Sequence, residues 1–432
     1  MNTITSNVET NAPPRAASRG RHILRRIGRG LLVLLALLVV AAIVFLIAWA
    51  RGMIQFPALT GPYPVGKVDY HLVDASRPEV FSAAPDDMRE LMITIYYPAS
   101  PPAGASPAPY TEGPIRAAFG TAEFFQDSVR AHAFVDVPLA DDGARYPVIV
   151  FSPGMGFLPI KYAPTLEDLA SHGYVVVSLS HPYSTAATVF PDSRVVTSTA
   201  EAGSRALSEA TAKATSDAEF DPVVNRIGSV WVADVRFVLD QMEQFDASDS
   251  LFAGRLDLTR VGVFGHSVGG GAAAAAMYED DRFDAAINMD GTLFGEVATH
   301  GVARPLMLML SERVPLTDQQ IKLSGSTREA NAYFQQREAT TQATVYEHAA
   351  PGYRLTLEGS THRTFIGFEP IAAPAILIPS EIVGTIDGAR AVGIINDYVV
   401  SFFDQHLRGQ SSALLGASPT DYPEMVFESR NP

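Results

Sequence analysis

The chain has 432 residues, of which 47% are hydrophobic and 18% are charged; this composition is typical of a folded globular protein and excludes a disordered one. It has no cysteine, which excludes disulfides, thiolate nucleophiles and cysteine-ligated metals. The formal net charge is −15, although residues 1–30 hold six arginines against Glu9 and so carry +5. Because nucleic-acid binding needs positive charge, the acidic remainder argues against nucleic acid as a partner.

The first predicted element is a membrane-spanning helix. Residues 31–50 have the sequence LLVLLALLVVAAIVFLIAWA, twenty residues without a charge. At a rise of 1.5 Å per residue such a helix spans about 30 Å, the hydrocarbon thickness of a bilayer. The basic leader, residues 1–30, predicts a single-pass protein whose N-terminus is cytoplasmic and whose remaining domain is exported.

A cleaved signal peptide is the alternative. Residues 48–50, Ala-Trp-Ala, fit a small-x-small cleavage site, and cleavage after Ala50 would release a secreted protein. We favour the uncleaved anchor, because the apolar stretch is longer than that of a usual signal peptide and the basic leader is long.

The exported part predicts an α/β fold. After a linker at 51–61, strands and helices alternate, which predicts a mostly parallel central sheet with helices on both faces. We expect one domain over 62–410 and a C-terminal tail at 411–432. The predicted strands are 68–73, 91–97, 146–151, 175–179, 261–264, 283–289, 305–310 and 353–357, and the predicted helices are 166–172, 230–245 and 391–407.

One segment interrupts this alternation. Residues 184–228 are polar and rich in Ala, Ser and Thr, with few core residues. Long connections of this kind in compact domains often carry function. We therefore predict an insertion that lies over the functional site as a lid.

A Gly-x-Ser-x-Gly pentapeptide indicates the chemistry. Residues 265–269, Gly-His-Ser-Val-Gly, follow an apolar strand and precede the alanine-rich segment 272–277. The order strand, sharp turn, helix is that of the α/β-hydrolase fold, in which the turn lifts a nucleophilic serine above the sheet. Ser267 is therefore the candidate nucleophile. The alternative is a serine that only caps the following helix.

A serine nucleophile needs a base, and the base needs an orienting acid. In α/β-hydrolases the chain order is serine, acid, histidine. Of the histidines after Ser267, His362 lies in a loop directly after the last predicted strand, where it would reach the carboxyl edge of the sheet. We take His362 as the candidate base.

Two carboxylates fit the role of the acid. Asp290 ends the strand 283–289, and Glu312 follows the strand 305–310, so both lie at the carboxyl edge where catalytic groups gather. Spacing alone favours Asp290 and leaves Glu312 as the alternative acid.

An oxyanion intermediate needs two backbone N–H groups. Val268, which follows the nucleophile, is expected to offer one. The loop after the strand 146–151 is expected to offer the other, from Met155 between Gly154 and Gly156. Pro153 has no N–H and is excluded.

Two other signals are discounted. Residues 61–68 nearly match a phosphate-binding loop, but they lack the Ser or Thr that would hold magnesium, and two prolines remove N–H donors. We therefore expect no nucleotide. His172 and His181 have no partner at metal-ligand spacing, so we expect no metal and no other cofactor.

Several segments recur together in the order of a known family: GPYPVG (61–66), YYP (96–98), VFSPGMG (150–156), GHSVGG (265–270), MD (289–290), LSE (310–312) and GSTH (359–362). They resemble the plasma and type-II intracellular platelet-activating factor acetylhydrolases and their bacterial relatives. The resemblance implies a serine esterase with Ser267, Asp290 and His362 as its triad and Met155 as its second oxyanion amide. It also implies short-acyl esters as substrates, among them the sn-2 ester of phospholipids.

The chain departs from the family pattern at three places. Pro153 stands where the family usually has histidine, and the insertion and the N-terminal anchor are not general features. Because Ser-Pro-Gly also occurs in polyester-cleaving and cutinase-like hydrolases, a polyester hydrolase or a general lipase-type esterase is the alternative. A membrane-tethered binding protein on an inactive hydrolase fold is the non-enzyme alternative.

Overall fold

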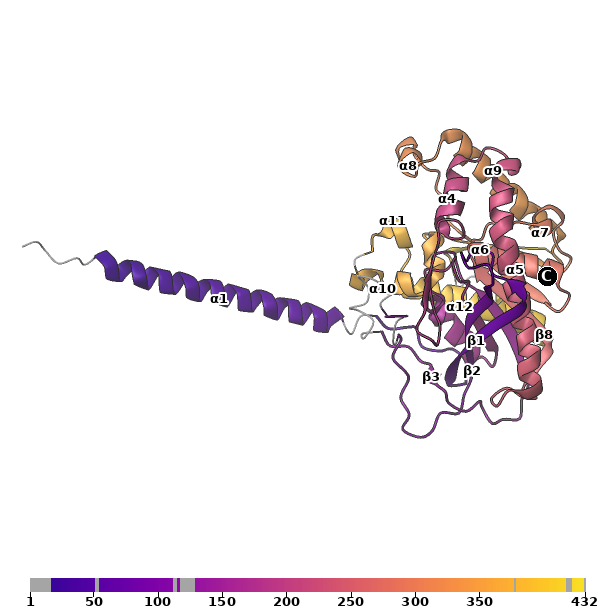
Figure 1. Ribbon diagram of the computed structural model, residues 1–432, viewed down its shortest axis with the longest axis horizontal. Coiled ribbons are helices and arrows are strands. Elements are labelled where there is room, and N and C mark those ends of the chain that lie inside the picture. Colours follow the sequence, from indigo (N-terminus) through magenta and orange to yellow (C-terminus); the bar gives the residue numbers. More distant parts are fainter. Residues whose placement is uncertain are drawn as a thin grey trace, which may run out of the picture. The chain divides into compact units, whose positions relative to one another are not determined.

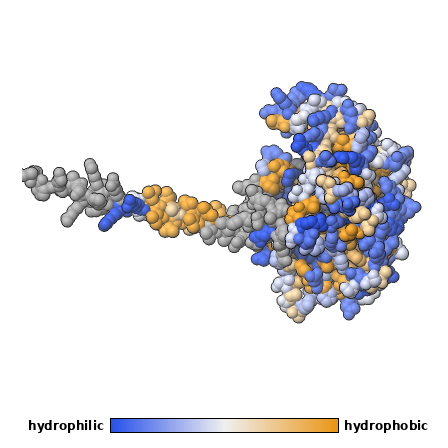
Figure 2. Space-filling model, viewed as in Figure 1, coloured by the Kyte–Doolittle hydropathy of each residue, from blue (hydrophilic) through white to orange (hydrophobic). Residues whose placement is uncertain are grey.

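The computed structural model describes residues 17–50, 54–111, 115–116, 129–376, 378–416 and 422–430. It divides the chain into two compact units, residues 1–52 and 53–432. The first unit contains the helix α1 (Ala17–Ala50). Its described apolar side chains between residues 31 and 43 are exposed, and Figure 2 shows them as a hydrophobic stretch. The window Arg26–Ile43 is long and apolar enough to cross a membrane.

The second unit is built on one large sheet, which has ten strands in the described residues (Figure 1). Six neighbouring strands, from β11 to β5, are parallel. At the edges, β12 is antiparallel to β11, β2 is antiparallel to both β5 and β1, and β3 is parallel to β1. The spatial order is β12 (Met425–Arg430), β11 (Gly352–Leu357), β10 (Leu306–Ser311), β9 (Ala285–Met289), β8 (Leu256–His266), β4 (Tyr146–Ser152), β5 (Val175–Leu179), β2 (Met88–Pro98), β1 (Val65–Pro78) and β3 (Phe134–Val135). The predicted mostly parallel sheet is confirmed.

Two hydrophobic cores cover the two faces of the sheet. In β4, Val148 and Val150 belong to one core, and Ile149 and Phe151 belong to the other, because successive side chains of a strand point to opposite faces. The first core includes side chains of α5 (Asp217–Ser248), α6 (Val268–Glu279), α7 (Glu296–His300) and α9 (Arg328–His348). The second includes side chains of α3 (Ala163–Ser171), α10 (Phe368–Ile376) and α12 (Gly388–Arg408).

Among the segments that differ from the expected ones, two are at the edge and on one face of the sheet. Within 411–432, assigned to a C-terminal tail, β12 pairs antiparallel with β11 at the edge of the sheet. Its burial alternates, so only Met425 is buried and the strand has a weak hydrophobic signal. Helix α9 was not predicted at all. Four of its six buried residues are charged or polar and therefore hide the apolar period: the six are Ala330, Arg337, Glu338, Thr341, Gln342 and Val345.

The predicted insertion contains secondary structure of its own. It forms the hairpin β6 (Ala187–Val189) and β7 (Val195–Thr197), the helix α4 (Ser204–Lys213) and the first turns of α5. Figure 1 shows α4, α9 and the short helix α8 (Asp318–Leu323) gathered at one end of this unit. None of the residues of α4 is fully buried, and its half-buried Ala206, Leu207 and Ala210 pack against the first core.

Candidate active site

The sharp turn at Ser267 has the strained geometry that the pentapeptide predicts. β8 ends at His266, α6 begins at Val268, and Ser267 between them has φ 57° and ψ −128°. A Cβ at Gly265 would lie 2.3 Å from the carbonyl oxygen of Gly269, and one at Gly269 would lie 2.2 Å from that of Ser152. Only glycine fits either position, Gly265 because the turn itself crowds it and Gly269 because the end of β4 packs against it.

His362 and Asp290 are hydrogen-bonded to each other. Nδ1 of His362 is 2.8 Å from Oδ2 of Asp290. Asp290 also accepts hydrogen bonds from Ser311, whose N–H is 3.0 Å from Oδ1 and whose hydroxyl is 2.9 Å from Oδ2. Burial by itself would raise the pKa of Asp290, but His362, Ser311 and the charge of Arg313 together lower it below its ordinary value. Asp290 is therefore a carboxylate at neutral pH.

Glu312 contacts the histidine loop in another way. Its Oε2 accepts a hydrogen bond from the backbone N–H of Gly359, 2.7 Å away, and the residue is exposed. Of the two candidate acids, the structure brings Asp290 to the imidazole of His362 and holds Glu312 against the loop that precedes it.

One cavity brings the candidate residues together. Ser267, Asp290 and His362 line the same cavity of about 580 Å³, which is within the usual range for small-molecule sites. Its polar wall also contains Ser311 and Arg313, which the sequence analysis did not single out. Their position was the available signal, because Ser311 is the last residue of β10 and Arg313 follows it shortly after, at the same sheet edge as Asp290.

A chain of hydrogen bonds ties the loop after β4 to His362. Gly154 N–H donates to the hydroxyl of Tyr162 (3.0 Å), which is 2.7 Å from Nδ1 of His266. Nε2 of His266 is 2.9 Å from the carbonyl oxygen of His362. Because a carbonyl only accepts, Nε2 of His266 carries the hydrogen, and Tyr162 donates to Nδ1. His266, the second residue of the pentapeptide, thus supports the loop of the candidate base.

The two candidate oxyanion amides have no hydrogen-bond partner in the part of the chain that the structure describes. Gly154 N–H and Gly156 N–H are both used, the latter by the carbonyl of Ser184 at 2.9 Å, whereas Met155 N–H between them is free. Val268 N–H, the first of α6, is also free, as the first amides of a helix are. An oxyanion requires free N–H groups of this kind.

Comparison with known proteins identifies the family. The family model of platelet-activating factor acetylhydrolase, isoform II, matches residues 49–413. The chain belongs to this family. The resemblance noted in the sequence is thereby confirmed.

Relatives of this acetylhydrolase family are named as esterases. A protein of Arthroderma benhamiae named a probable 1-alkyl-2-acetylglycerophosphocholine esterase is 26% identical over 86% of this chain and 93% of its own length. The platelet-activating factor acetylhydrolase of Cavia porcellus is 26% identical, over 65% of this chain and 62% of its own length. A solved ferulic acid esterase of Streptomyces cinnamoneus is 31% identical with a TM-score of 0.68, covering 87% of this chain and 99% of its own.

These comparisons agree on the reaction class. This member of the acetylhydrolase family is a serine carboxylester hydrolase with an α/β-hydrolase fold. They favour an enzyme over the non-enzyme alternative. Among the described residues, no group of three or more His, Cys, Asp or Glu side chains is placed to hold a metal ion.

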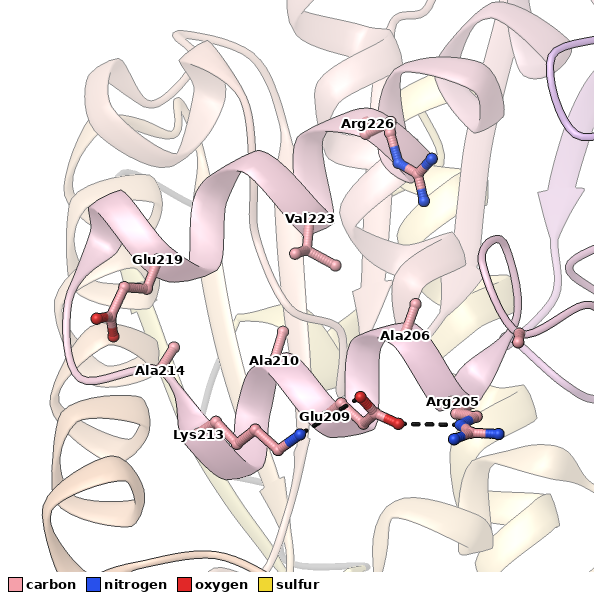
Figure 3. Close-up of a pocket in the computed structure, with 10 residues that line it drawn as sticks. Arg205, Ala206, Glu209, Ala210, Lys213, Ala214, Glu219, Val223 and Arg226 are labelled. Carbon is pink, nitrogen blue, oxygen red and sulfur yellow. Dashed lines mark hydrogen bonds and ion pairs between the residues drawn. The ribbon is translucent and has the colours of Figure 1, made fainter.

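The insertion borders the cavity that Ser267, Asp290 and His362 line. Leu207, Ser208 and Thr211 of α4 line it on one side. The opposite side of α4 faces a second cavity of about 700 Å³ between α4 and the first turns of α5 (Figure 3). There Glu209 pairs with Arg205 at 2.9 Å and with Lys213 at 3.4 Å. Helix α4 thus separates two cavities. That residues 184–228 act as a lid stays a prediction.

A buried carboxyl group in the cavity predicts a pH-dependent stability. Burial raises the pKa of Glu338 to about 7, against the attraction of Arg313 and Arg337. Between pH 4.5 and 7 the Glu338 side chain loses its proton in the unfolded chain but keeps it in the folded protein. The free energy of unfolding therefore falls as the pH rises through this range, by about 3 kcal/mol in all. We expect Glu338→Gln to raise the melting temperature relative to the wild type more at pH 8 than at pH 5.

Thermal unfolding at the two pH values measures this effect. Glu347→Gln, on an exposed position of the same helix, is the matched control and should show no such pH-dependent difference. An equal shift of Glu338→Gln at both pH values would contradict the prediction.

Proposed function

We propose that Ser267 is the nucleophile of an acyl-enzyme mechanism, that His362 is its general base and that Asp290 orients the histidine. The observation that carries this proposal is the hydrogen bond between His362 and Asp290 in a cavity that the strained Ser267 also lines. The substrates we propose are short-acyl esters, including the sn-2 ester of phospholipids.

In the proposed mechanism each proton has a defined place. Asp290 is a carboxylate, so Nδ1 of His362 donates to it and Nε2 is left to accept the proton of the Ser267 hydroxyl. The serine oxygen attacks the ester carbonyl, and the N–H groups of Met155 and Val268 stabilise the oxyanion. Each such donor contributes about 10²–10³-fold to kcat in serine hydrolases. His362 then protonates the leaving alcohol, and water releases the acyl group by the same route.

The names of the relatives support a phospholipid ester. Two relatives are named for platelet-activating factor or 1-alkyl-2-acetylglycerophosphocholine, and the solved neighbour is named a ferulic acid esterase. A polyester or lipase-type esterase is the alternative. Turnover of a panel of p-nitrophenyl esters with increasing acyl length separates them, because a short-acyl enzyme should lose activity as the chain grows. A preference for long acyl chains or for polyester films would favour the alternative.

Arg313 supports a substrate with a negative group. It is the one lysine or arginine among the described residues that line the cavity, and its side chain is 47% exposed. A guanidinium suits phosphate because it offers several N–H donors in a fixed plane. We expect Arg313→Gln to raise KM for a short-acyl phospholipid about tenfold, the equivalent of one charged hydrogen bond.

The same variant should leave KM for p-nitrophenyl acetate nearly unchanged, because that ester has no phosphate. Arg354→Gln, which alters a surface arginine paired with Glu428, is the matched control. If Arg313→Gln affects both esters equally, the arginine does not distinguish the phosphate.

We also propose that α1 anchors the protein with its N-terminus in the cytoplasm. Support comes from the apolar window Arg26–Ile43 and from the arginines that precede residue 31. We expect mass spectrometry of the membrane fraction to find the chain intact, with residues 1–50 attached. A mature N-terminus at Arg51 would instead show a cleaved signal peptide.

A further inference from the structure

A second group of serine, histidine and aspartate lies outside the cavity. Ser152 ends β4, His181 follows β5, and Asp234 belongs to α5. The Oγ of Ser152 is 2.9 Å from Nε2 of His181, and Nδ1 of His181 is 2.8 Å from Oδ2 of Asp234. All three residues are 0% exposed. No ester can reach Ser152, so this group, here called the buried relay, has the contacts of a catalytic triad without its access.

Charge balance fixes the direction of each hydrogen bond. Arg89 donates to both carboxylate oxygens of Asp234, at 3.0 Å and 2.5 Å, and Arg77 lies 3.0 Å from Oδ1. Burial would raise the pKa of Asp234, but Arg89 and His181 lower it below its usual value, so it is a carboxylate. Burial also lowers the pKa of His181. The neutral ring donates from Nδ1, and its Nε2 accepts from the Ser152 hydroxyl.

The buried relay and the turn at residues 181–184 hold both ends of the loop 152–156. Ser152 begins this loop and is bonded to the ring of His181. At the other end, Gly156 N–H donates to the carbonyl of Ser184 (2.9 Å), and Ser184 N–H donates to the carbonyl of His181 (3.0 Å). Met155 lies between these two points of attachment. The imidazole of His181 is itself stacked on Trp231, with ring centroids 3.8 Å apart.

The same loop packs directly against the nucleophile turn. The carbonyl oxygen of Ser152 would lie 2.6 Å from a Cβ at Gly265 and 2.2 Å from one at Gly269. With no free space between them, a shift of Ser152 changes the distance between the loop and the turn at Ser267. An N–H group that moves by about 1 Å loses much of its effect on a transition state.

We propose that Ser152, His181 and Asp234 are positioning residues that hold the N–H of Met155 toward the oxyanion. This inference rests on the proposed function, because it assigns the relay a part in stabilising the intermediate formed at Ser267. The relay acts through the loop and does not touch the substrate.

The test compares three variants of the full-length protein. Ser152→Ala removes only the hydroxyl, and His181→Phe keeps the ring stacked on Trp231 but removes both hydrogen bonds. Ser178→Ala is the matched control, since Ser178 is a buried serine on the neighbouring strand β5 whose hydroxyl has no partner among the described residues. For each we measure kcat and KM for p-nitrophenyl acetate, and inhibition by a trifluoromethyl ketone, which forms a tetrahedral adduct with an oxyanion.

Both relay variants should lower kcat by about 10–100-fold and weaken inhibition by the ketone by a similar factor. KM should stay nearly unchanged, because only the oxyanion interaction is impaired. A merely structural role would lower the melting temperature without weakening the ketone selectively. If Ser152→Ala has the same kcat and the same ketone inhibition as Ser178→Ala, the inference is wrong. The Ser152→Ala result is decisive even if His181→Phe does not fold. If the wild-type protein shows no turnover that is lost in Ser267→Ala, the proposed function itself is wrong.

Discussion

Replacing Ser267 with alanine should lower kcat for p-nitrophenyl acetate by about 10⁴–10⁶-fold, the range of triad knockouts in serine hydrolases. Without the hydroxyl no acyl-enzyme forms, and only binding and the oxyanion amides remain. Steady-state kinetics of the purified variant measure the loss. A fluorophosphonate probe should label the wild type and leave Ser267→Ala unlabelled.

The matched control for this experiment is Ser178→Ala. Both variants remove one serine hydroxyl, but Ser178 is buried in β5 and its hydroxyl has no partner among the described residues, so Ser178→Ala should keep its turnover and still react with the probe. Turnover retained by Ser267→Ala at the wild-type rate would end the assignment of this residue as the nucleophile.

The second large effect is expected at Asp290. Asp290→Asn should lower kcat by about 10⁴-fold, because an amide in this place favours the wrong tautomer of the histidine. Glu312→Gln should change kcat less than about tenfold, because its contact with the backbone of Gly359 is a single exposed hydrogen bond. The two variants are isosteric with the wild type, which makes the comparison direct.

Thermal unfolding of both variants serves as the control for folding. A large loss in Glu312→Gln together with a small loss in Asp290→Asn would move the role of the acid to Glu312. Equal losses with equal destabilisation would indicate that both carboxylates act only through the structure of the loop.

Elements with strong local signals were predictable from the sequence. The strands β4, β5 and β10 are mostly apolar and buried at every residue, and their predicted positions agree with the structure within one residue at each end. The turn at Ser267 was predictable because the pentapeptide 265–269 follows an apolar run directly and precedes an alanine-rich one. The long apolar helix α1 was predictable for a similar reason, because the composition of a single segment is enough to indicate it.

Elements whose buried face is polar were not predictable. Helix α9 buries Arg337 and Glu338, so its pattern does not separate an inner face from an outer one. Glu338 and Arg313 are in the cavity only because α9 and the end of β10 meet there. His181, which the sequence analysis considered only as a metal ligand, was equally hidden, since its partners Ser152 and Asp234 lie 29 and 53 positions away.

By itself, the sequence determined the alternation of the central strands with helices, the turn at Ser267 and the two candidate acids, because each has a signal among neighbours in the chain. Only the tertiary structure decided which acid meets His362. Asp290 is 72 positions from that histidine, and the pairing of β9 with β10 and of β10 with β11 brings them to one edge. The physical reason is that contacts across a sheet depend on the spatial order of its strands, which a local pattern does not contain.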